Sequence, residues 1–295
     1  MRLIRDIFAE AREADRAVVS CEFFPTKTPE GKRSLLEKTI PRLKVFQPSF
    51  CSVTYGAGGS TRDKTLDIVE NIQREHGLPS MAHLTCVGSK REDIDKFLID
   101  AQARGIDNIL ALRGDPPEGQ KEFVRTEGGF EFSYQLVEAI REHEGFSIGT
   151  AGFPEGHIAC TEGREVDWQR LKAKVDCGAD FVITQLFFDN SDFFRFRNYL
   201  RDLGLDRPIS AGIIPILSGR QIRRFTELCG AKLPDRLSNK LDELGDDDDA
   251  VREFGIDFAT QQCQELLEAN VDGLHFYTLN KSYSIVRIMA NLGIS

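Results

Sequence analysis

The stretch Val18-Val19-Ser20-Cys21-Glu22-Phe23-Phe24-Pro25 shows the pattern on which the fold of this chain depends. It is short, almost continuously apolar and closed by a proline, as expected of a β-strand buried on both faces of a parallel sheet. Comparable runs recur along the chain at Phe50–Tyr55, Met81–Val87, Asn108–Asp115, Ser147–Pro154, Phe181–Phe188, Ile209–Ile216 and Gly273–Asn280. The sequence therefore predicts eight strands.

Charged segments with helical periodicity separate these runs. The segment Ser34–Lys44 has apolar residues at helical spacing. Pro41 is expected to kink it, because proline lacks the N–H that a helix interior needs. Nearer the C-terminus, one face of a longer helix is expected to consist of Val251, Phe254, Phe258, Cys263, Leu266 and Leu267.

The spacing of the strands favours one closed barrel. Most strand starts are roughly 27 to 39 residues apart, the length of one strand–helix unit. The seventh interval is about twice as long and predicts an extra helical element before the eighth strand, with Asp246–Asp249 as a solvated loop. We expect a single-domain (β/α)8 TIM barrel over residues 1–295; a doubly wound parallel sheet is the alternative.

Composition limits the partners and the compartment. The 295 residues have 38 Lys+Arg against 47 Asp+Glu, a net charge of -9, which argues against a nucleic-acid partner. The seven cysteines form no Cys-x-x-Cys pair, as expected of a reduced, cytoplasmic protein without a metal site. The N-terminus has no apolar signal segment, and no apolar run reaches 18 residues, so neither secretion nor membrane insertion is expected.

Polar residues cluster where the predicted strands end. In a barrel of this kind, functional side chains lie at the C-terminal ends of the strands. The residues at these ends are Glu22, Thr54, Tyr55, His83, Thr85, Arg113, Asp115, His157, Gln185, Thr278, Asn280 and Lys281. Six or seven strands with polar groups at the same end predict a site there.

Glu22 and Asp115 are the candidate acids. Glu22 lies among apolar residues, so burial should raise its pKa and suit it to general acid catalysis; the alternative is a structural Glu bonded to a loop or an Arg. Asp115 precedes Pro116-Pro117 and either accepts hydrogen bonds from an amide-bearing heterocycle or begins an Asx-turn.

Other candidates each have a plainer interpretation. Arg113 holds a phosphate or pairs with an acid, and Gln185 meets a ligand or a neighbouring side chain. The run Gly56-Ala57-Gly58-Gly59-Ser60-Thr61 is either an anion nest before a helix or a flexible loop. His275 is consistent with a core histidine whose hydrogen bonds are satisfied.

Seven motifs in order resemble one known family. They are Glu22-Phe23-Phe24-Pro25, Ser52-Val53-Thr54-Tyr55-Gly56-Ala57, His83-Leu84-Thr85-Cys86, Ala111-Leu112-Arg113-Gly114-Asp115, Thr184-Gln185 with Phe187-Phe188-Asp189, Gly212-Ile213-Ile214-Pro215 and His275-Phe276-Tyr277-Thr278-Leu279-Asn280. Together they resemble methylenetetrahydrofolate reductases of the short bacterial type, without the regulatory domain of the eukaryotic enzymes. The resemblance implies non-covalent FAD, NADH or NADPH as a transient hydride donor, and ping-pong reduction of methylenetetrahydrofolate for methionine synthesis.

The resemblance also implies residue roles. Glu22 would be the general acid and Asp115 would bind the pterin and tune the flavin, while Gln185, Gln221, Phe225 and Lys281 would bind folate. The FAD contacts would be Thr54, Tyr55, Ala57, His83, Arg113, Gly114, Asp115, Ser133, Phe153, His157, Asp167, Arg170 and Lys174.

Four positions depart from the family pattern. Lys281 stands where Arg is usual and loses the bidentate fork. Phe153 replaces a Tyr, Ala173 a basic residue and Arg170 an uncharged polar one. None of these changes affects Glu22 or Asp115.

Two alternative functions share part of this chemistry. One is another barrel flavoenzyme that acts on an amine, similar to proline dehydrogenase. The other is a flavin-free folate-binding barrel or a non-catalytic subunit. A homo-oligomer and the choice of nicotinamide are left open by the sequence.

Overall fold

A computed structural model describes residues 1–55, 62–115 and 123–294, and its eight parallel strands close into a barrel in chain order, β1 to β8. The strands are β1 Val18–Phe23, β2 Phe50–Val53, β3 Ser80–Thr85, β4 Asn108–Leu112, β5 Ser147–Gly152, β6 Phe181–Leu186, β7 Ile209–Ile213 and β8 Gly273–Tyr277. Each lies within, or within one residue of, a predicted run. The barrel is confirmed, and the doubly wound alternative is wrong because β8 pairs with β1.

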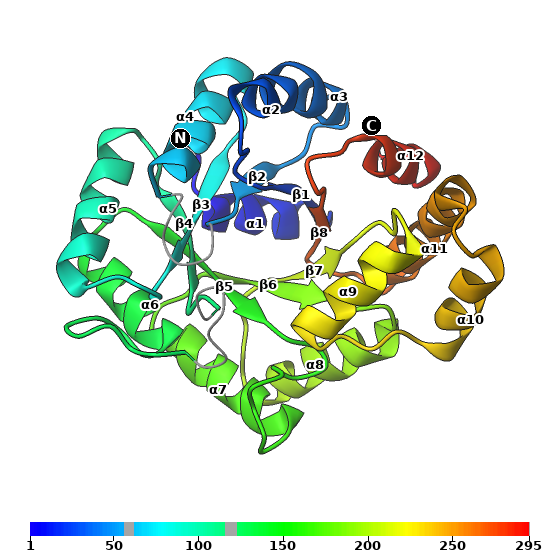
Figure 1. Cartoon of the computed structure of the whole chain (residues 1–295). Helices are drawn as coiled ribbons and strands as arrows, with labels where there is room; N and C mark the ends of the chain where they lie inside the picture. Colours follow the sequence, from blue (N-terminus) through cyan, green and yellow to red (C-terminus); the bar gives the residue numbers. More distant parts are fainter. Residues whose placement is uncertain (56–61, 116–122, 295) are drawn as a thin grey trace.

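Helices surround the strands, and their order along the chain can be followed by colour in Figure 1. They are α1 Ile4–Glu13, α2 Pro29–Ser34, α3 Ile40–Lys44, α4 Arg62–His76, α5 Arg91–Ala103, α6 Ser133–Glu142, α7 Arg164–Asp176, α8 Asn190–Asp202, α9 Gly219–Cys229, α10 Asp235–Leu244, α11 Asp248–Glu268 and α12 Tyr283–Asn291. The extra helical element predicted before the eighth strand is present, since α9, α10 and α11 all lie between β7 and β8.

Pro41 disturbs its helix as expected, but the helix widens into a π-helical turn before the proline. A π-helical turn, η1 Leu35–Thr39, joins α2 to α3, and Pro41 is in the first turn of α3. Proline cannot donate to the carbonyl four residues earlier and clashes with it, and a wider turn relieves that clash.

Two expectations around α11 need correction. The run Asp246–Asp249 is not all loop, because the Asp247 carboxylate caps α11 by accepting from the N–H groups of Asp249 and Ala250. Acidic residues favour a helix N-terminus, where they offset its partial positive charge. The buried face of α11 also differs from the predicted one: Ile256 and Ala259 are buried, whereas Phe254 and Phe258 are half-buried.

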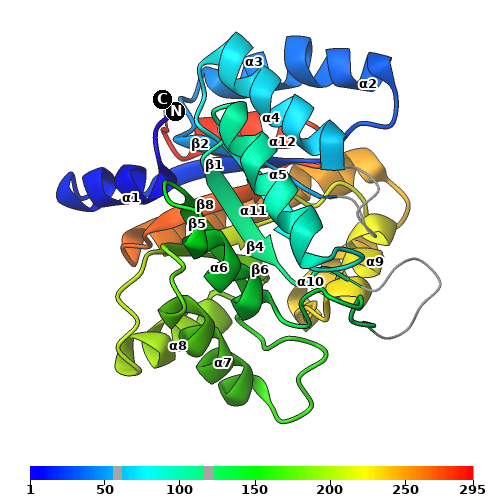
Figure 2. The ribbon, with the colours of Figure 1, turned by 90° about the vertical axis from the view of Figure 1, so that its left-hand side faces the viewer.

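The strands have one face toward the helices and one toward the barrel interior. Outward residues such as Val19, Cys21 and Phe23 belong to the main apolar core beneath the helices. The inward residues near the strand starts, which include Val18, Phe50, Met81, Leu110 and Phe181, pack instead against Ile4, Ile7, Phe8 and Ala11 of α1. Helix α1 therefore closes the N-terminal end of the barrel, opposite α9 in Figure 2.

Further along the strands the inward positions are polar. On β1 the inward series continues from Val18 to Ser20 and Glu22, two residues at a time, and on β3 it continues from Met81 to His83 and Thr85. The interior is thus apolar at the closed end and polar at the C-terminal end, where the sequence predicted a site.

Three further observations concern the described residues. None of their helices has the length and apolarity required to cross a bilayer. All seven cysteines are free thiols. Within residues 1–55, 62–115 and 123–294, no group of three or more His, Cys, Asp and Glu side chains is arranged so that it could hold a metal ion.

Candidate active site at the C-terminal end of the barrel

A buried acid–imidazole cluster lies inside the barrel. Oε2 of Glu22 on β1 is 3.2 Å from Nε2 of His275 on β8 and 3.3 Å from Nε2 of His83 on β3. Nδ1 of His275 in turn lies 2.8 Å from the Ser20 hydroxyl. Because an ionised carboxylate accepts only, Nε2 of His275 donates to it, and Nδ1 of a neutral ring then accepts from Ser20. The arrangement links Ser20, His275 and Glu22 in one hydrogen-bonded chain.

The pKa of Glu22 moves in the direction opposite to the prediction. Burial alone would raise it, but the charge of a protonated His83, the hydrogen bonds of both imidazoles and the charge of His275 outweigh burial and lower the pKa to about 2. The prediction was wrong because it considered the apolar neighbours along the chain and not the imidazoles brought by other strands.

Tyr277 closes one side of this cluster. Its ring is edge-to-face with His275, with centroids 5.3 Å apart, and its hydroxyl donates to the Thr184 carbonyl at 2.7 Å. Gly212 makes room for it, since a Cβ there would lie 2.8 Å from the Tyr277 ring and 2.2 Å from the Thr184 oxygen. Only glycine fits at this point of β7, which is a physical reason for the Gly212-Ile213-Ile214-Pro215 motif.

Gln185 lies at an irregularity of the sheet. The register between β6 and β7 shifts between Ile183 and Leu186, and Oε1 of Gln185 accepts from the Leu186 N–H at 2.9 Å. The side chain is half-buried at the C-terminal end of β6. The amide oxygen of Gln185 therefore finds its hydrogen-bond partner in the adjacent backbone, at the Leu186 N–H.

A second, cationic cluster lies at the ends of β4 and β5. The charges of Arg113 and Lys174 both act on His157 and on Cys86, so these groups are neighbours. The Lys174 ammonium donates to the Ala151 carbonyl at 2.9 Å, and the His157 N–H donates to the Asp167 carboxylate at 3.1 Å. His157 and Lys174 thus both lie close enough to Asp167 for their charges to act on it, and the charge of Arg113 acts on the same His157 ring.

Burial lowers the basicity of two members of this cluster. It lowers the pKa of Lys174 to about 8, although Asp167 acts in the opposite direction. Burial and then the charge of Arg113 lower the pKa of His157. Burial also raises the pKa of Asp167. An anion placed beside Lys174 and His157 would stabilise the charged forms of these two side chains.

Gly114 fixes how β4 ends. It has φ +87°, and a Cβ there would lie 2.7 Å from Cγ1 of Val87. The chain then reaches Asp115, which is exposed, while Arg113 is half-buried with its guanidinium 5.3 Å from the Phe123 ring centroid. Ala57, with the rest of residues 56–61, and Pro116-Pro117 lie outside the described residues.

The remaining predicted residues lie at the same end of the barrel. Thr54 and Tyr55 follow β2, Ser133 begins α6, and the Phe153 ring is edge-to-face with His157 at 4.5 Å. Arg170 is exposed and bonds Glu162 at 3.2 Å, so it is less closely engaged with this cluster than Lys174. Gln221 and Phe225 are half-buried on α9, and Lys281 is exposed after β8.

The set of residues fits a flavin nucleotide. In the part of the chain that the structure describes, the buried Oγ1 of Thr85 has no hydrogen-bond partner, and Nε2 of His83 has only the Glu22 carboxylate, 3.3 Å away. Buried polar atoms are usually satisfied, so Oγ1 of Thr85 favours a polar ligand inside the barrel. The positive charges of Arg113 and Lys174 and the ring N–H of His157 suit a diphosphate. Sequence reasoning did not assign Ser20 and Tyr277 to the site, although their spacing of two residues from Glu22 and His275 places them on the inward face.

Comparison with known proteins is consistent with this geometry. The family model described as Methylenetetrahydrofolate reductase matches residues 7–293. The Arabidopsis thaliana protein named methylenetetrahydrofolate reductase (NADH) 1 is 42% identical over 299 residues, 98% of this chain and 50% of that protein. The 5,10-methylenetetrahydrofolate reductase of Pectobacterium carotovorum subsp. carotovorum is 34% identical over 280 residues, 95% of this chain and 91% of that protein. The chain thus spans about half the length of the plant relative.

Among solved structures, a Clostridium thermocellum protein is similar in fold. It is described as binding two copies of 5-methyl-5,6,7,8-tetrahydrofolic acid. The TM-score is 0.67 with 15% sequence identity, over 97% of each chain. At this identity the likeness concerns the barrel alone.

Proposed function

The chain belongs to the methylenetetrahydrofolate reductase family, and we propose that it reduces 5,10-methylenetetrahydrofolate to 5-methyltetrahydrofolate with a reduced nicotinamide, supplying methyl groups for methionine synthesis. The observation on which the proposal depends is the position of the Glu22 cluster and the cationic cluster at the same end of one barrel. The first handles protons and the second binds an anionic cofactor. The plant relative's printed name supports NADH as the donor.

FAD is the cofactor that the cationic cluster fits. Arg113, His157 and Lys174 would hold the diphosphate, and Thr54, Tyr55, Gly114, Ser133, Phe153, Asp167 and Arg170 would surround the rest of the nucleotide. When bound, FAD supplies hydride transfer between the nicotinamide and the folate. The two substrates would use the same mouth of the barrel in turn, a ping-pong order.

Glu22 would deliver the proton that opens the five-membered ring of the folate. Because its own pKa is low, the proton would come from the coupled imidazoles, with His275 held in place by Ser20. Once a folate nitrogen takes the proton from Glu22, the carboxylate can receive another from the imidazolium form of His83 or His275, whose Nε2 atoms lie 3.3 Å and 3.2 Å away, and this leaves a neutral imidazole. In this form Glu22 remains the general acid, and the two histidines are its proton store.

The folate side of the site would come from the opposite wall. Gln185 at the end of β6, Gln221 and Phe225 on α9, and Lys281 after β8 would bind the pterin and its side chain, with Asp115 across from them. The Clostridium thermocellum barrel, described as binding a methylated tetrahydrofolate, supports a folate in a barrel of this shape. The free cysteines and acidic charge agree with a cytoplasmic enzyme without a nucleic-acid partner.

The test is a pair of half-reactions. Purified protein should be yellow, and anaerobic NADH or NADPH should bleach the flavin band. Methylenetetrahydrofolate should then restore the band. A colourless protein with no affinity for FAD would favour the flavin-free rival, and reduced flavin that methylenetetrahydrofolate does not reoxidise would favour a flavoenzyme acting on another amine.

A further inference from the structure

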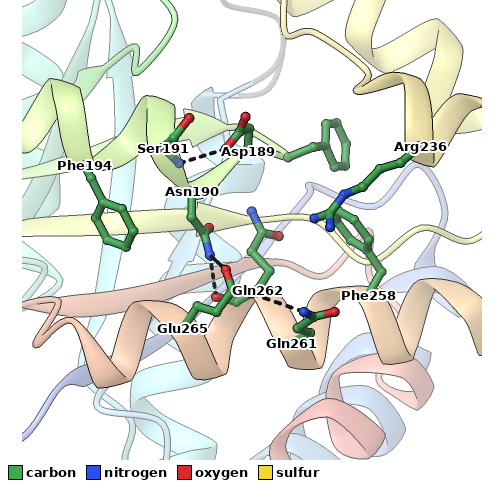
Figure 3. Close-up of a pocket in the computed structure, with 10 residues that line it drawn as sticks. Asp189, Asn190, Ser191, Phe194, Arg236, Phe258, Gln261, Gln262 and Glu265 are labelled. Carbon is green, nitrogen blue, oxygen red and sulfur yellow. Dashed lines mark hydrogen bonds between the residues drawn. The ribbon is translucent and has the colours of Figure 1, made fainter.

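A pocket of about 270 Å³ lies outside the barrel, between the N-terminus of α8, α10 and α11. Water occupies about 30 Å³ per molecule in the liquid, so the pocket has room for a small organic molecule. Its lining is shown in Figure 3 and consists of Phe188, Asp189, Asn190, Ser191, Phe194, Arg236, Phe258, Gln261, Gln262 and Glu265. None of these residues belongs to the proposed folate or flavin site.

Asn190 presents an unused acceptor to this pocket. Its side chain is 8% exposed, and its Nδ2 donates to the Gln262 carbonyl at 3.1 Å and to Oε2 of Glu265 at 2.8 Å. Rotating the amide by half a turn would place its oxygen against these two acceptors, so the orientation is fixed. Among the described residues, Oδ1 of Asn190 has no hydrogen-bond partner. A buried acceptor without a donor is a cost that a ligand N–H would remove.

The charge of the pocket is negative. Asp189 and Glu265 supply two carboxylates, and Arg236 supplies the one cation in the lining. The positive end of α8 is already offset, because Asp189 accepts from the Ser191 N–H at 2.9 Å. Arg236 is exposed, with its guanidinium 5.6 Å from the Phe258 ring centroid. The part of the pocket around the buried Asn190 and the exposed Glu265 therefore has acceptors and a negative charge.

The walls are aromatic. Phe188 is buried, and Phe194 and Phe258 are half-buried. Aromatic faces attract cations and cover short alkyl chains. An anion would be repelled by Glu265 and would leave Oδ1 of Asn190 without a donor.

We propose that this pocket binds a small organic primary ammonium ion. Its N–H groups donate to Oδ1 of Asn190 and to the Glu265 carboxylate, and its alkyl part lies among Phe188, Phe194 and Phe258. No covalent step is involved. The proposal stands apart from the proposed reductase activity, since it uses different residues and can be tested without substrate.

The experiment uses n-butylammonium as the probe with the complete chain. Titration followed by ¹⁵N NMR should move the side-chain NH₂ signals of Asn190, with saturable, millimolar binding. Butyrate has a similar chain and the opposite charge and should not bind. Glu265→Gln keeps an acceptor for Asn190 and removes the charge, so it should weaken butylammonium binding by roughly tenfold. Glu268→Gln, on the same helix but outside the pocket, should leave the affinity unchanged.

The outcomes are distinct. Equal binding of butyrate and butylammonium, or equal loss in the two Gln variants, would overturn the proposal in favour of unspecific association. No movement of the Asn190 signals at saturating probe would leave the pocket as a hydrated cleft and also overturn it. A failure of the flavin half-reactions would not affect the binding of butylammonium or its selectivity over butyrate.

Discussion

Oε2 of Glu22 lies 3.2 Å from Nε2 of His275, although the two residues are 253 positions apart in the chain. They meet because β8 closes the barrel against β1, with Ser20 opposite His275 and Glu22 opposite Tyr277 in register. The His275 ring bridges this offset of two residues, bonding Ser20 with one nitrogen and Glu22 with the other. Barrel closure thus assembles the proton-handling cluster.

Glu22→Gln should separate the two half-reactions. Reduction of the flavin by the nicotinamide should be nearly unchanged, because it needs no proton from this cluster. Reduction of methylenetetrahydrofolate should slow by at least about 100-fold, the scale of lost acid catalysis. Stopped-flow absorbance measures both steps, with Glu268→Gln as a surface control. If both steps slowed equally, Glu22 would be a structural or general electrostatic residue.

Acid should destabilise the wild type more than Glu22→Gln. The pKa of Glu22 is about 2 in the folded chain against an ordinary value of 4.5, so the stability that the ionised side chain contributes is present above pH 4.5 and is lost as the pH falls toward 2. Between about pH 5.5 and about pH 3.5, the wild type should lose roughly 1 kcal/mol more free energy of unfolding than the variant. Urea unfolding at both pH values measures this, and parallel losses would mean that Glu22 is not held ionised.

Affinity for FAD should fall in alkali through Lys174. Its pKa is about 8, so its charge is present below that pH and is lost above it. If only the ammonium form binds the diphosphate, the dissociation constant should rise up to about tenfold by about pH 9. Flavin fluorescence titration measures it. Lys174→Met should bind FAD more weakly at neutral pH and should lack this decline; an unchanged decline in the variant would assign it to another group.

Gly114→Ala should be more costly than a similar change elsewhere. The new Cβ would lie 2.7 Å from Cγ1 of Val87 at φ +87°, so both overpacking and backbone strain apply, and we expect a loss of about 2–4 kcal/mol. Gly105 has φ +69° with nothing within 4 Å, and Gly105→Ala should lose only about 1 kcal/mol. Chemical unfolding compares the two. Equal losses would show that β4 can shift its end without strain.

The strands were predictable because their signal is local. Runs such as Val18–Pro25 and Phe181–Phe188 are apolar whatever their neighbours, and their spacing indicates the barrel. The pKa of Glu22 was not predictable, since its direction depends on His83 and His275 from other strands. The pocket at Asn190 was also missed, because it forms only where α8 meets α11.

Smaller departures have local causes. The run Asp246–Asp249 is charged enough to suggest a solvated loop, but the same carboxylates suit a helix start, and composition does not decide between the two. The rotation of α11 depends on which neighbours cover it. Gln262, polar by type, is buried because its amide donates to the Phe187 carbonyl at 2.9 Å.

Because helix α1 closes the N-terminal end, the barrel interior is open only at the C-terminal end. The helix residues Ile4, Ile7 and Phe8 fill the floor against Val18 and Phe50. Whatever enters through the C-terminal mouth must leave by the same route. If the nicotinamide and the folate bind there in turn, as proposed, an excess of either one should slow turnover because it keeps the other out.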